Sequence, residues 1–319
     1  MRKKILIWLY FQIESLFTKG IVKFHKLAFR VAEEDRFFGV HNSDANQVIS
    51  VGDNVGIIIT TFEERFEVYA LPLISTLRKS ISNPIFLVVN ANYDGPASSW
   101  SSRKLIEGLA AFENVFPIFF GQMQGCASLW NTGIKHSNCE ANFILNDDIS
   151  VNRNTIAEEM QIAVNLLKTE SLITINKSWS HFLISNKCLD EIGYFDERFL
   201  GFGDEDIDYI RRIIKKTGNE PANIFLLGFI NLVDQGKEEK VAGGKWGKYS
   251  LFNQCLSQLK YPEEKLAGAL PATRNLDTFP QDFEFSTIRK FRNQLYPMLL
   301  SKDPDDVTAS ILRFYSEEN

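Results

Sequence analysis

The run "VGIIIT", Val55 to Thr60, consists almost entirely of apolar and mostly β-branched residues. A continuous run of this kind is typical of a strand that is buried on both faces of a sheet. Further apolar runs and helix-type patterns alternate after it. The runs lie at residues 84–89, 114–120 and 142–145, and the helix-type patterns at 66–79, 101–112 and 126–137. This alternation predicts an α/β fold with parallel strands and right-handed crossovers.

The alternation continues toward the C-terminus. We expect helices at about 155–168 and 204–216, and strands at 171–176, 180–185 and 223–230. Past about Gly236 the composition becomes rich in Gly and Lys, and the segment from Leu251 has a mostly helical pattern interrupted by Pro. The chain therefore divides into an N-terminal extension (1–50), an α/β domain (51–240), and a flexible loop with a helical C-terminal region (241–319).

Composition excludes some functions. The chain has 319 residues, 45% of them hydrophobic, and a formal net charge of −5. A negative chain without a stripe of Lys and Arg is not expected to bind nucleic acid. The four cysteines show no CxxC spacing, which favours buried thiols in a reducing compartment over disulfides or a zinc site.

The N-terminal extension is basic. Its first 30 residues hold seven Lys and Arg residues against one Glu. Gln12, Glu14 and Lys19 interrupt its apolar residues, so it is not expected to span a bilayer, and no cleavage pattern of a secretory signal follows it. It would lie on an anionic membrane surface as an amphipathic helix, or pack as a helix on the main domain or another subunit. Both readings stay open.

Two adjacent acids follow the expected strand at 142–145, in "LNDDIS" (Leu145 to Ser150). Ligands bind at the carboxyl ends of the strands in such sheets. Mg²⁺ and Mn²⁺ are typically held there by one or two carboxylates together with substrate phosphates. The alternative is a polar turn that merely ends the strand.

A second acidic cluster begins the helix expected at about 204–216. Four acids stand within five positions, at Asp204, Glu205, Asp206 and Asp208, after the run "FLGFG". Acids in a first turn match the helix dipole, which is the structural explanation. Four are more than capping needs, so a carboxylate here is a candidate general base for a hydroxyl nucleophile.

The order of these segments resembles glycosyltransferases of the GT-A fold, with family 2 the closest likeness. The segment "IGYFDERFLGFGDEDIDYIRR" is its most specific part, and it also resembles the "GWGGEDDD" motif of β-1,4-galactosyltransferases. The resemblance covers about Val55 to Ile230. It implies a Rossmann-like mixed sheet flanked by helices, with helical N- and C-terminal extensions.

The resemblance assigns roles to the acidic residues. "LNDD" matches the DxD-type motif, which implies that Asp148 binds Mn²⁺ or Mg²⁺, and that Asp147 supports it or contacts the nucleotide. Asn146 stands where many relatives have Asp. Asp206 matches the catalytic base of inverting members, and Glu205 the acid that positions the acceptor. Asp208 is expected to cap the helix.

Other positions are implied to contact the nucleotide-sugar donor. Asn131 of "WNTG" matches the Asn of the family's "RNxG" element. Residues after the first strand correspond to those that bind the base, namely Thr60, Phe62 and Glu63. Three further residues are candidates for contacts with the substrate: His181, which is otherwise a packed or capping residue, Asp204, and Trp246 in the Gly-rich loop.

Three departures from the family pattern stand out. Asn90 occupies the place of an Asp that contacts the base, so the choice of base is open. Trp130 replaces the Arg of "RNxG". The family's late His, a third metal ligand, is absent, and Asp234 is the candidate substitute.

Together these features predict an enzyme that transfers a sugar from a nucleotide-diphosphate sugar, with UDP as the expected nucleotide. The acceptor would be a hydroxyl of a glycan or lipid-linked molecule in cell-surface polysaccharide synthesis, and the anomeric centre would invert. The expected location is cytoplasmic, peripheral at the inner membrane face. The alternatives are a non-catalytic carbohydrate- or nucleotide-binding module and a sugar-phosphate nucleotidyltransferase, although the latter's Gly-rich N-terminal loop is missing.

Overall fold

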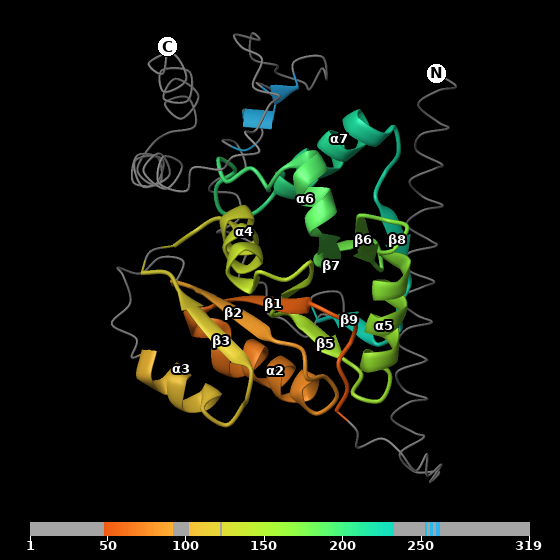
Figure 1. Ribbon diagram of the computed structural model, residues 1–319. Coiled ribbons are helices and arrows are strands. Elements are labelled where there is room, and N and C mark those ends of the chain that lie inside the picture. The colour runs from red at the N-terminus through yellow and green to blue at the C-terminus, as the bar shows by residue number, and fades with distance from the viewer. Residues whose placement is uncertain are drawn as a thin grey trace, which may run out of the picture.

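The run that begins at Val55 forms β1 (Val55–Phe62), an inner strand of a seven-stranded sheet (Figure 1). The computed structural model describes residues 48–91, 102–121, 123–232, 253, 256–257 and 260–261. The expectations for residues 1–47, Asp234 and Trp246 and for most of residues 241–319 lie outside this part of the chain.

The sheet is mixed. Its order is β3-β2-β1-β4-β7-β6-β8, and its other strands are β2 (Ile85–Asn90), β3 (Val115–Phe119), β4 (Ala141–Asn146), β6 (Leu172–Ile175), β7 (Ser178–Ser185) and β8 (Ala222–Ile224). The first four strands are parallel, as their alternation with helices predicts. β7 then runs antiparallel to both β4 and β6. Asn176 and Lys177 join β6 to β7 with φ of 55° and 56°, as a two-residue hairpin turn requires.

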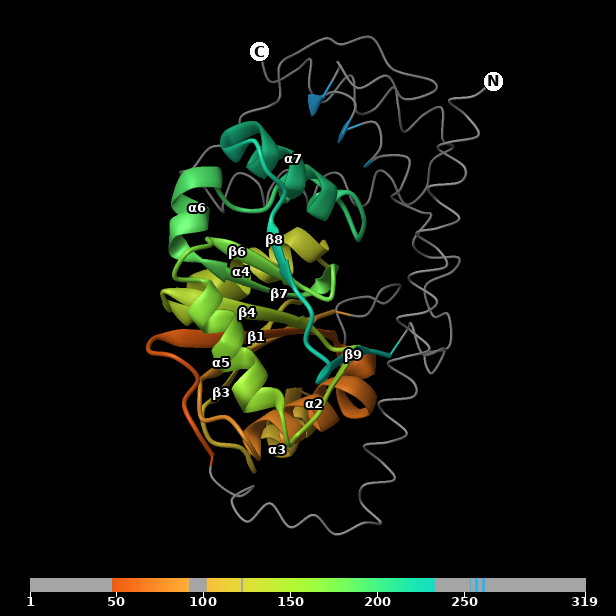
Figure 2. The same cartoon turned by 90° about the vertical axis from the view of Figure 1, so that its right-hand side faces the viewer.

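Helices cover both faces of the sheet (Figures 1 and 2). One core lies beneath α2 (Leu71–Arg78), α3 (Ser102–Leu109) and α5 (Ile156–Leu166), and the other beneath α4 (Cys126–Ser137), α6 (Asn186–Ile192) and α7 (Glu205–Thr217). Alternate residues of β1 point to opposite faces, so Ile57 and Ile59 enter the first core and Ile58 the second. The expected α/β sheet flanked by helices is confirmed.

The strand expected at 223–230 is wrong as a single element. Its ends form β8 in the large sheet and β9 (Phe229–Asn231), which pairs with β5 (Ile149–Val151). Polar side chains hold the backbone between them. The Asn176 amide binds Leu226 through both its N–H and its C=O, and the Glu159 carboxylate accepts the N–H of Gly228 at 2.8 Å. The apolar run therefore bends out of the sheet.

Two local elements differ from the expectations. The helix expected at 66–79 begins with a 3₁₀ turn, η1 (Glu63–Arg65), and a wide turn, η2 (Phe66–Ala70), before α2. α6 was not expected from the sequence. Ser185 begins it by accepting the N–H of Cys188 at 3.3 Å.

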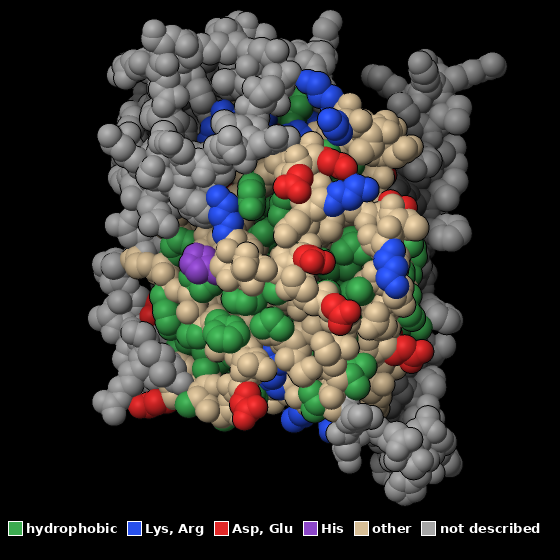
Figure 3. Space-filling view, in the orientation of Figure 1, with side chains coloured by type: hydrophobic (Ala, Val, Ile, Leu, Met, Phe, Trp, Pro, Cys, Tyr) green, Lys and Arg blue, Asp and Glu red, His purple; other side chains and the backbone are tan. Residues whose placement is uncertain are grey.

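β3 forms one end of the sheet in the described part of the chain and exposes apolar rings. Phe116 and Phe119 are 47% and 43% exposed, and hydrophobic side chains gather over β2 and β3 in Figure 3. Pro117 lies in this strand and lacks a backbone donor, as is typical of edge strands. β3 therefore does not line the strand ends described next.

Candidate active site

Polar side chains meet where β1 and β4 end side by side. Thr60 is paired in register with Asn146. The Thr60 hydroxyl donates to Asn146 Oδ1 at 2.9 Å, and the Trp130 indole N–H donates to the same oxygen at 3.4 Å. The Asn146 amide oxygen therefore receives protein donors, and Trp130 is a packed residue beneath this turn, as its contacts with Phe182 and Phe195 show.

Asp147 forms an ion pair that the sequence analysis did not anticipate. Arg65 donates from Nη2 to Oδ1 at 2.8 Å and from Nε to Oδ2 at 3.0 Å, and the Thr61 hydroxyl donates to Oδ2 at 2.6 Å. The Arg65 guanidinium also lies over the Tyr69 ring at 4.3 Å. Bidentate Arg–carboxylate pairs are strong and fix orientation. This pair removes the repulsion that two adjacent carboxylates would otherwise suffer.

Asp148 follows at the turn between β4 and β5 and is half-buried. Its carbonyl oxygen accepts the N–H of Leu232 at 2.8 Å, which joins the turn to the end of β9. Leu232, directly after β9, therefore lies beside the Asp148 backbone.

The second acidic cluster begins α7 after an unusual loop. Gly201, Gly203 and Asp204 have φ of 60°, 105° and 70°, so the chain turns sharply before the helix. Burial, with the charges of Asp206 and Asp204, raises the pKa of Glu205 to about 8. Burial also raises the pKa of Asp206, and burial with the charge of Asp206 raises that of Asp204. At neutral pH Glu205 therefore holds a proton.

Cys126 joins α4 to the loop before α7. It is the buried first residue of α4, and its N–H donates to Gly201 of the loop before α7 at 2.7 Å. Burial raises its pKa well above the usual range, and the charges of Glu205, Asp206 and Asp148 raise it further. The hydrogen bond from Cys126 to Gly201 therefore holds the start of α4 against the loop before α7, although the two segments lie far apart in the sequence.

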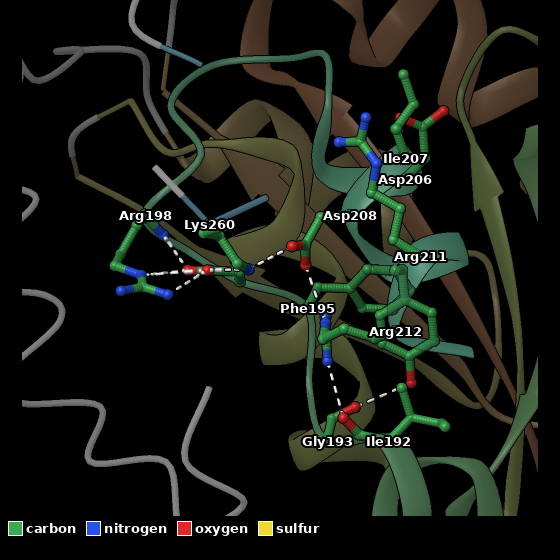
Figure 4. Close-up of polar contacts among 12 residues, drawn as sticks. Ile192, Gly193, Phe195, Arg198, Asp206, Ile207, Asp208, Arg211, Arg212 and Lys260 are labelled. Atoms are coloured by element: carbon green, nitrogen blue, oxygen red, sulfur yellow. Dashed lines mark hydrogen bonds and ion pairs between the residues drawn. The ribbon is translucent and has the colours of Figure 1, made fainter. Parts of the chain in front are cut away.

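Asp208 does not cap α7, contrary to the expectation. Its side chain turns inward, where it accepts Arg212 Nε at 2.9 Å and the Tyr261 hydroxyl at 2.8 Å, and pairs with Lys260. Figure 4 shows Asp208 directed toward Lys260, whereas Asp206 points away from it. The helix periodicity places these two acids on different faces, so Asp206 and Glu205 stay candidates for chemistry, and a substrate contact by Asp204 stays a prediction.

Two expected donor contacts are buried amides that cross-link the fold. Asn90 donates to the carbonyl of Gln124 at 3.0 Å and accepts its N–H at 2.8 Å. Asn131 donates to the carbonyl of Phe195 at 2.8 Å, accepts its N–H at 3.0 Å, and reaches Glu197 at 3.1 Å. These contacts position the residues before α4 and before α7. Nucleotide contacts by either amide stay predictions.

The remaining candidates lie around the end of β1. Thr60 is buried, Glu63 is half-buried in η1, and the Phe62 ring packs on Phe202 with centroids 5.5 Å apart. Phe62 thus connects the strand end with the loop before α7. A role for Thr60, Phe62 and Glu63 in binding a base stays a prediction.

His181 lies deeper in the fold. It is 1% exposed and stacks on Phe229, and burial lowers its pKa to about 4. Nδ1 is 3.1 Å from the Ser180 hydroxyl, while Nε2 has no hydrogen-bond partner among the described residues. The neutral, packed ring favours the structural alternative, and a substrate contact stays a prediction.

The described residues contain no assembled group of three or more His, Cys, Asp or Glu side chains that could hold a metal ion by themselves. Asp147 is engaged by Arg65 and Thr61, so metal ligation by Asp147 would require that pair to open. Asp148 fits a hard cation that takes one protein carboxylate and completes its shell with phosphates. The residues present therefore suit a metal that binds together with a nucleotide diphosphate.

Sequence reasoning missed Arg65 and Cys126. Arg65 stands five residues after Thr60 in "TTFEERFE", and nothing in that spacing indicates its partner. Cys126 had only its place at the start of an expected helix. Arg65 meets Asp147 only because the ends of β1 and β4 lie side by side, and Cys126 meets Gly201 only because α4 packs beside the loop before α7.

No helix in the described part of the chain has the length and apolar character needed to cross a bilayer. No protein-family model and no curated protein matches this sequence.

Among solved structures, the chain is similar to three glycosyltransferases. It aligns with mannosyltransferase PcManGT from Pyrobaculum calidifontis, in complex with GDP-Man and Mn²⁺, at 12% identity and TM-score 0.48, over 94% of this chain and 85% of that one. It aligns with S. aureus TarS 1–349 at 13% identity and TM-score 0.40, over 55% of this chain and 58% of that one, so this chain spans little more than half of that protein. It aligns with GalNAc-T7, in complex with UDP, GalNAc and Mn²⁺, at 11% identity and TM-score 0.45, over 75% of this chain and 54% of that one. The expected similarity to GT-A glycosyltransferases is thus found at the level of the fold.

Proposed function

We propose that this protein is a glycosyltransferase that takes a sugar from a nucleotide-diphosphate sugar. One observation carries the proposal: the Phe62 ring at the end of β1 packs on Phe202 at 5.5 Å, and the Cys126 N–H donates to Gly201 at 2.7 Å, so the carboxyl ends of the parallel strands adjoin the loop that leads into α7. A carboxylate at a strand end suits a metal-bound diphosphate, and a second carboxylate across from it suits an acceptor hydroxyl.

Asp206 is the proposed general base. It is half-buried, its pKa is raised by burial, and it lies outside the buried ion pairs of Asp208. It would take the proton of the acceptor hydroxyl as that oxygen bonds to the anomeric carbon. The bond from this carbon to the diphosphate oxygen breaks, and the diphosphate leaves with the electron pair. Attack opposite the leaving group inverts the anomeric centre.

Glu205 and Asp148 would support this step. The protonated Glu205 carboxyl has a hydrogen to donate, which suits it to hold an acceptor oxygen beside Asp206. Asp148 would hold a divalent cation, Mn²⁺ or Mg²⁺, with the diphosphate, and the cation would supply positive charge that neutralises the leaving group. Arg65 keeps Asp147 neutralised beside it.

The resemblance of the sequence supports a finer proposal. We propose a UDP-linked donor and a hydroxyl of a glycan or lipid-linked acceptor in cell-surface polysaccharide synthesis. The basic residues 1–30 suit work at the inner face of a membrane. Removing residues 1–30 should then lower the fraction of protein that sediments with anionic vesicles, and unchanged sedimentation would reject the membrane role.

A thermal-shift screen of nucleotide sugars, each with and without Mn²⁺, tests the donor class. A ligand that binds only the native state raises the midpoint by mass action, so the true donor should produce the largest shift, and only with Mn²⁺. A screen in which no nucleotide sugar shifts the midpoint would contradict the proposal.

Two variants then test the roles. Asp206→Asn should lower turnover by at least about 100-fold and leave donor binding almost unchanged. Asp148→Ala should abolish the Mn²⁺-dependent part of the shift. Near-normal turnover of Asp206→Asn would overturn the base assignment, and an unchanged metal dependence of Asp148→Ala would overturn the metal assignment.

The non-catalytic alternative has its own outcome in the same assay. A nucleotide-binding module would show the thermal shift but form no glycoside with any acceptor offered. A sugar-phosphate nucleotidyltransferase would instead release pyrophosphate from a nucleoside triphosphate and a sugar phosphate. Assays for the glycoside and for pyrophosphate separate the three.

A further inference from the structure

The loop that delivers the acidic turn of α7 has a backbone that needs support. Gly201, Gly203 and Asp204 all have positive φ, and for the non-glycine Asp204 this conformation is unfavourable. Asp204 makes no side-chain cap to α7. The surrounding structure must therefore hold this loop if Glu205 and Asp206 are to keep one position.

A single buried amide grips both ends of the loop. Asn253 Oδ1 accepts the N–H of Leu200 at 2.9 Å, and Nδ2 donates to the carbonyls of Leu200 and Gly203 at 2.9 and 2.8 Å. The Asn253 side chain is fully buried, and it lies 53 residues after Leu200 in the sequence. Its three contacts fix the separation of the loop's two ends.

A buried ammonium, seven positions later, fixes the segments on either side of the loop. Lys260 pairs with Asp196 at 2.7 Å, before the loop, and with Asp208 in the first turns of α7. Although burial opposes it, Arg198 and Lys260 hold the pKa of Asp196 well below its usual range. Lys260 contacts both carboxylates, and Figure 4 shows its side chain directed toward Asp208. Both carboxylates are therefore bound to one ammonium.

We propose that Asn253 and Lys260 are positioning residues for the Glu205–Asp206 pair: together they hold the 200–208 backbone in the geometry that directs Asp206 toward an acceptor. In the described part of the chain, Asn253 contacts Leu200 and Gly203, and Lys260 contacts Asp196 and Asp208, so both act on Glu205 and Asp206 through the backbone of the loop. The inference rests on the proposed function only in taking Asp206 as the reactive group.

The test compares Asn253→Ala and Lys260→Met with Asn154→Ala and Lys216→Met, whose side chains are exposed. Hydrogen exchange at residues 201–207 should accelerate by about tenfold or more in the first pair, while β1 stays protected, because the loop opens locally. The controls should match the wild type. This readout needs no substrate.

Turnover and donor binding separate positioning from general damage. With the donor found in the thermal screen, kcat should fall about 10- to 100-fold in Asn253→Ala, because a small displacement of a reacting group is costly. The affinity for UDP with Mn²⁺ should stay within about twofold. Accelerated exchange with unchanged kcat would overturn the positioning role, as would an equal loss of UDP affinity.

The proposed function can fail separately. If no nucleotide sugar is a substrate, the exchange experiment still decides whether the loop depends on Asn253 and Lys260, and unchanged exchange overturns that dependence. If the alanine variant does not fold, Asn253→Asp replaces it: this change is isosteric but turns two donor contacts into repulsions. The same local acceleration is expected.

The wild-type protein supplies a reporter without mutation. The Leu200 N–H donates to the Asn253 side chain, and the Tyr261 N–H donates to the carbonyl of Ser257, which lies between Asn253 and Lys260 in the sequence. If Asn253 and Lys260 hold the loop, the Leu200 amide loses its protection whenever these residues detach. Its hydrogen exchange should therefore be at least as fast as that of the Tyr261 amide. A Leu200 amide that stays protected much longer would contradict the inference.

Discussion

The pair of Arg65 and Asp147 shows how one residue changes the meaning of a motif. Two neighbouring acids in "LNDD" suggest two metal ligands, but Arg65 and Thr61 satisfy Asp147 with three short contacts. Asp148 remains as the carboxylate suited to a cation. The two acids of the sequence therefore indicate a cation site, and the pairing of Asp147 with Arg65 leaves Asp148 as the candidate ligand.

Removing the Arg65 charge should leave a buried carboxylate uncompensated. We expect Arg65→Met to lower the free energy of unfolding by about 3 kcal/mol, as for other broken buried pairs. Adding Asp147→Asn should recover part of the loss, because the stranded charge disappears. Urea titrations of both variants and of the exposed control Lys79→Met measure this, and a double variant no more stable than Arg65→Met would contradict it.

Glu205 should make stability depend on pH. Its pKa rises from 4.5 in the unfolded chain to about 8 in the folded protein. Its stabilising contribution is therefore complete below about pH 4.5 and is lost as the pH rises to 8. Glu205→Gln should match the wild type at pH 5 and be more stable by about 2–4 kcal/mol at pH 8.

Urea unfolding at the two pH values measures this difference. The exposed Glu67→Gln serves as the matched control and should follow the wild type at both. Equal stability of Glu205→Gln and the wild type at pH 8 would show that Glu205 titrates normally.

At the scale of elements, α4 connects the two halves of the site. Asn131 binds the backbone of Phe195, Cys126 binds Gly201, and Gly133 lies against β1. The "WNTG" motif was interpreted as a donor contact. In the structure its Asn and Gly have packing roles that hold the loop before α7 against the sheet.

Gly133 permits the close approach of α4 and β1. A Cβ at this position would lie 2.3 Å from Ile58 Cγ2. Gly133→Ala should therefore destabilise the protein by about 1–3 kcal/mol through overpacking, although alanine is the better helix former by about 1 kcal/mol. Thermal and urea unfolding measure the change.

Gly108 in α3 is the matched control. A Cβ there would meet Phe66 at 3.4 Å, so Gly108→Ala should be neutral or stabilising. Equal effects of the two substitutions would show that the α4–β1 contact is not limiting.

At the scale of the whole molecule, the site depends on segments from all parts of the described chain. β1 and β4 supply the strand ends, α7 the acids, and Asn253 and Lys260 the support for the loop before α7. The described residues hold no assembled metal cluster, so metal and donor are expected to bind together.

Metal removal should reveal this coupling. EDTA should leave the melting midpoint of the ligand-free protein nearly unchanged, because one carboxylate binds a divalent cation weakly. The same treatment should abolish the stabilisation by UDP, since the diphosphate supplies the missing ligands. Differential scanning fluorimetry checks both, and a large EDTA effect without nucleotide would indicate a preformed metal site.

The sequence by itself determined the alternation of strands and helices from β1 to β4 and the positions of both acidic clusters in the chain, but not α6 or the division of 223–230 into β8 and β9. Those features follow from hydrophobic periodicity and turn residues, which are local. It could not place the 225–228 bend, because Asn176 and Glu159 hold that backbone from elsewhere.

Only the tertiary structure decided which acids face the site. Asp147 and Asp208 form ion pairs with Arg65, Arg212 and Lys260, whereas Asp148 and Asp206 are half-buried at the strand end and in the first turn of α7. The physical reason is distance along the chain. The orientation of a buried carboxylate depends on the group that pairs with it. Most of these partners lie about 50 to 80 residues away along the chain, so no local sequence pattern reveals them.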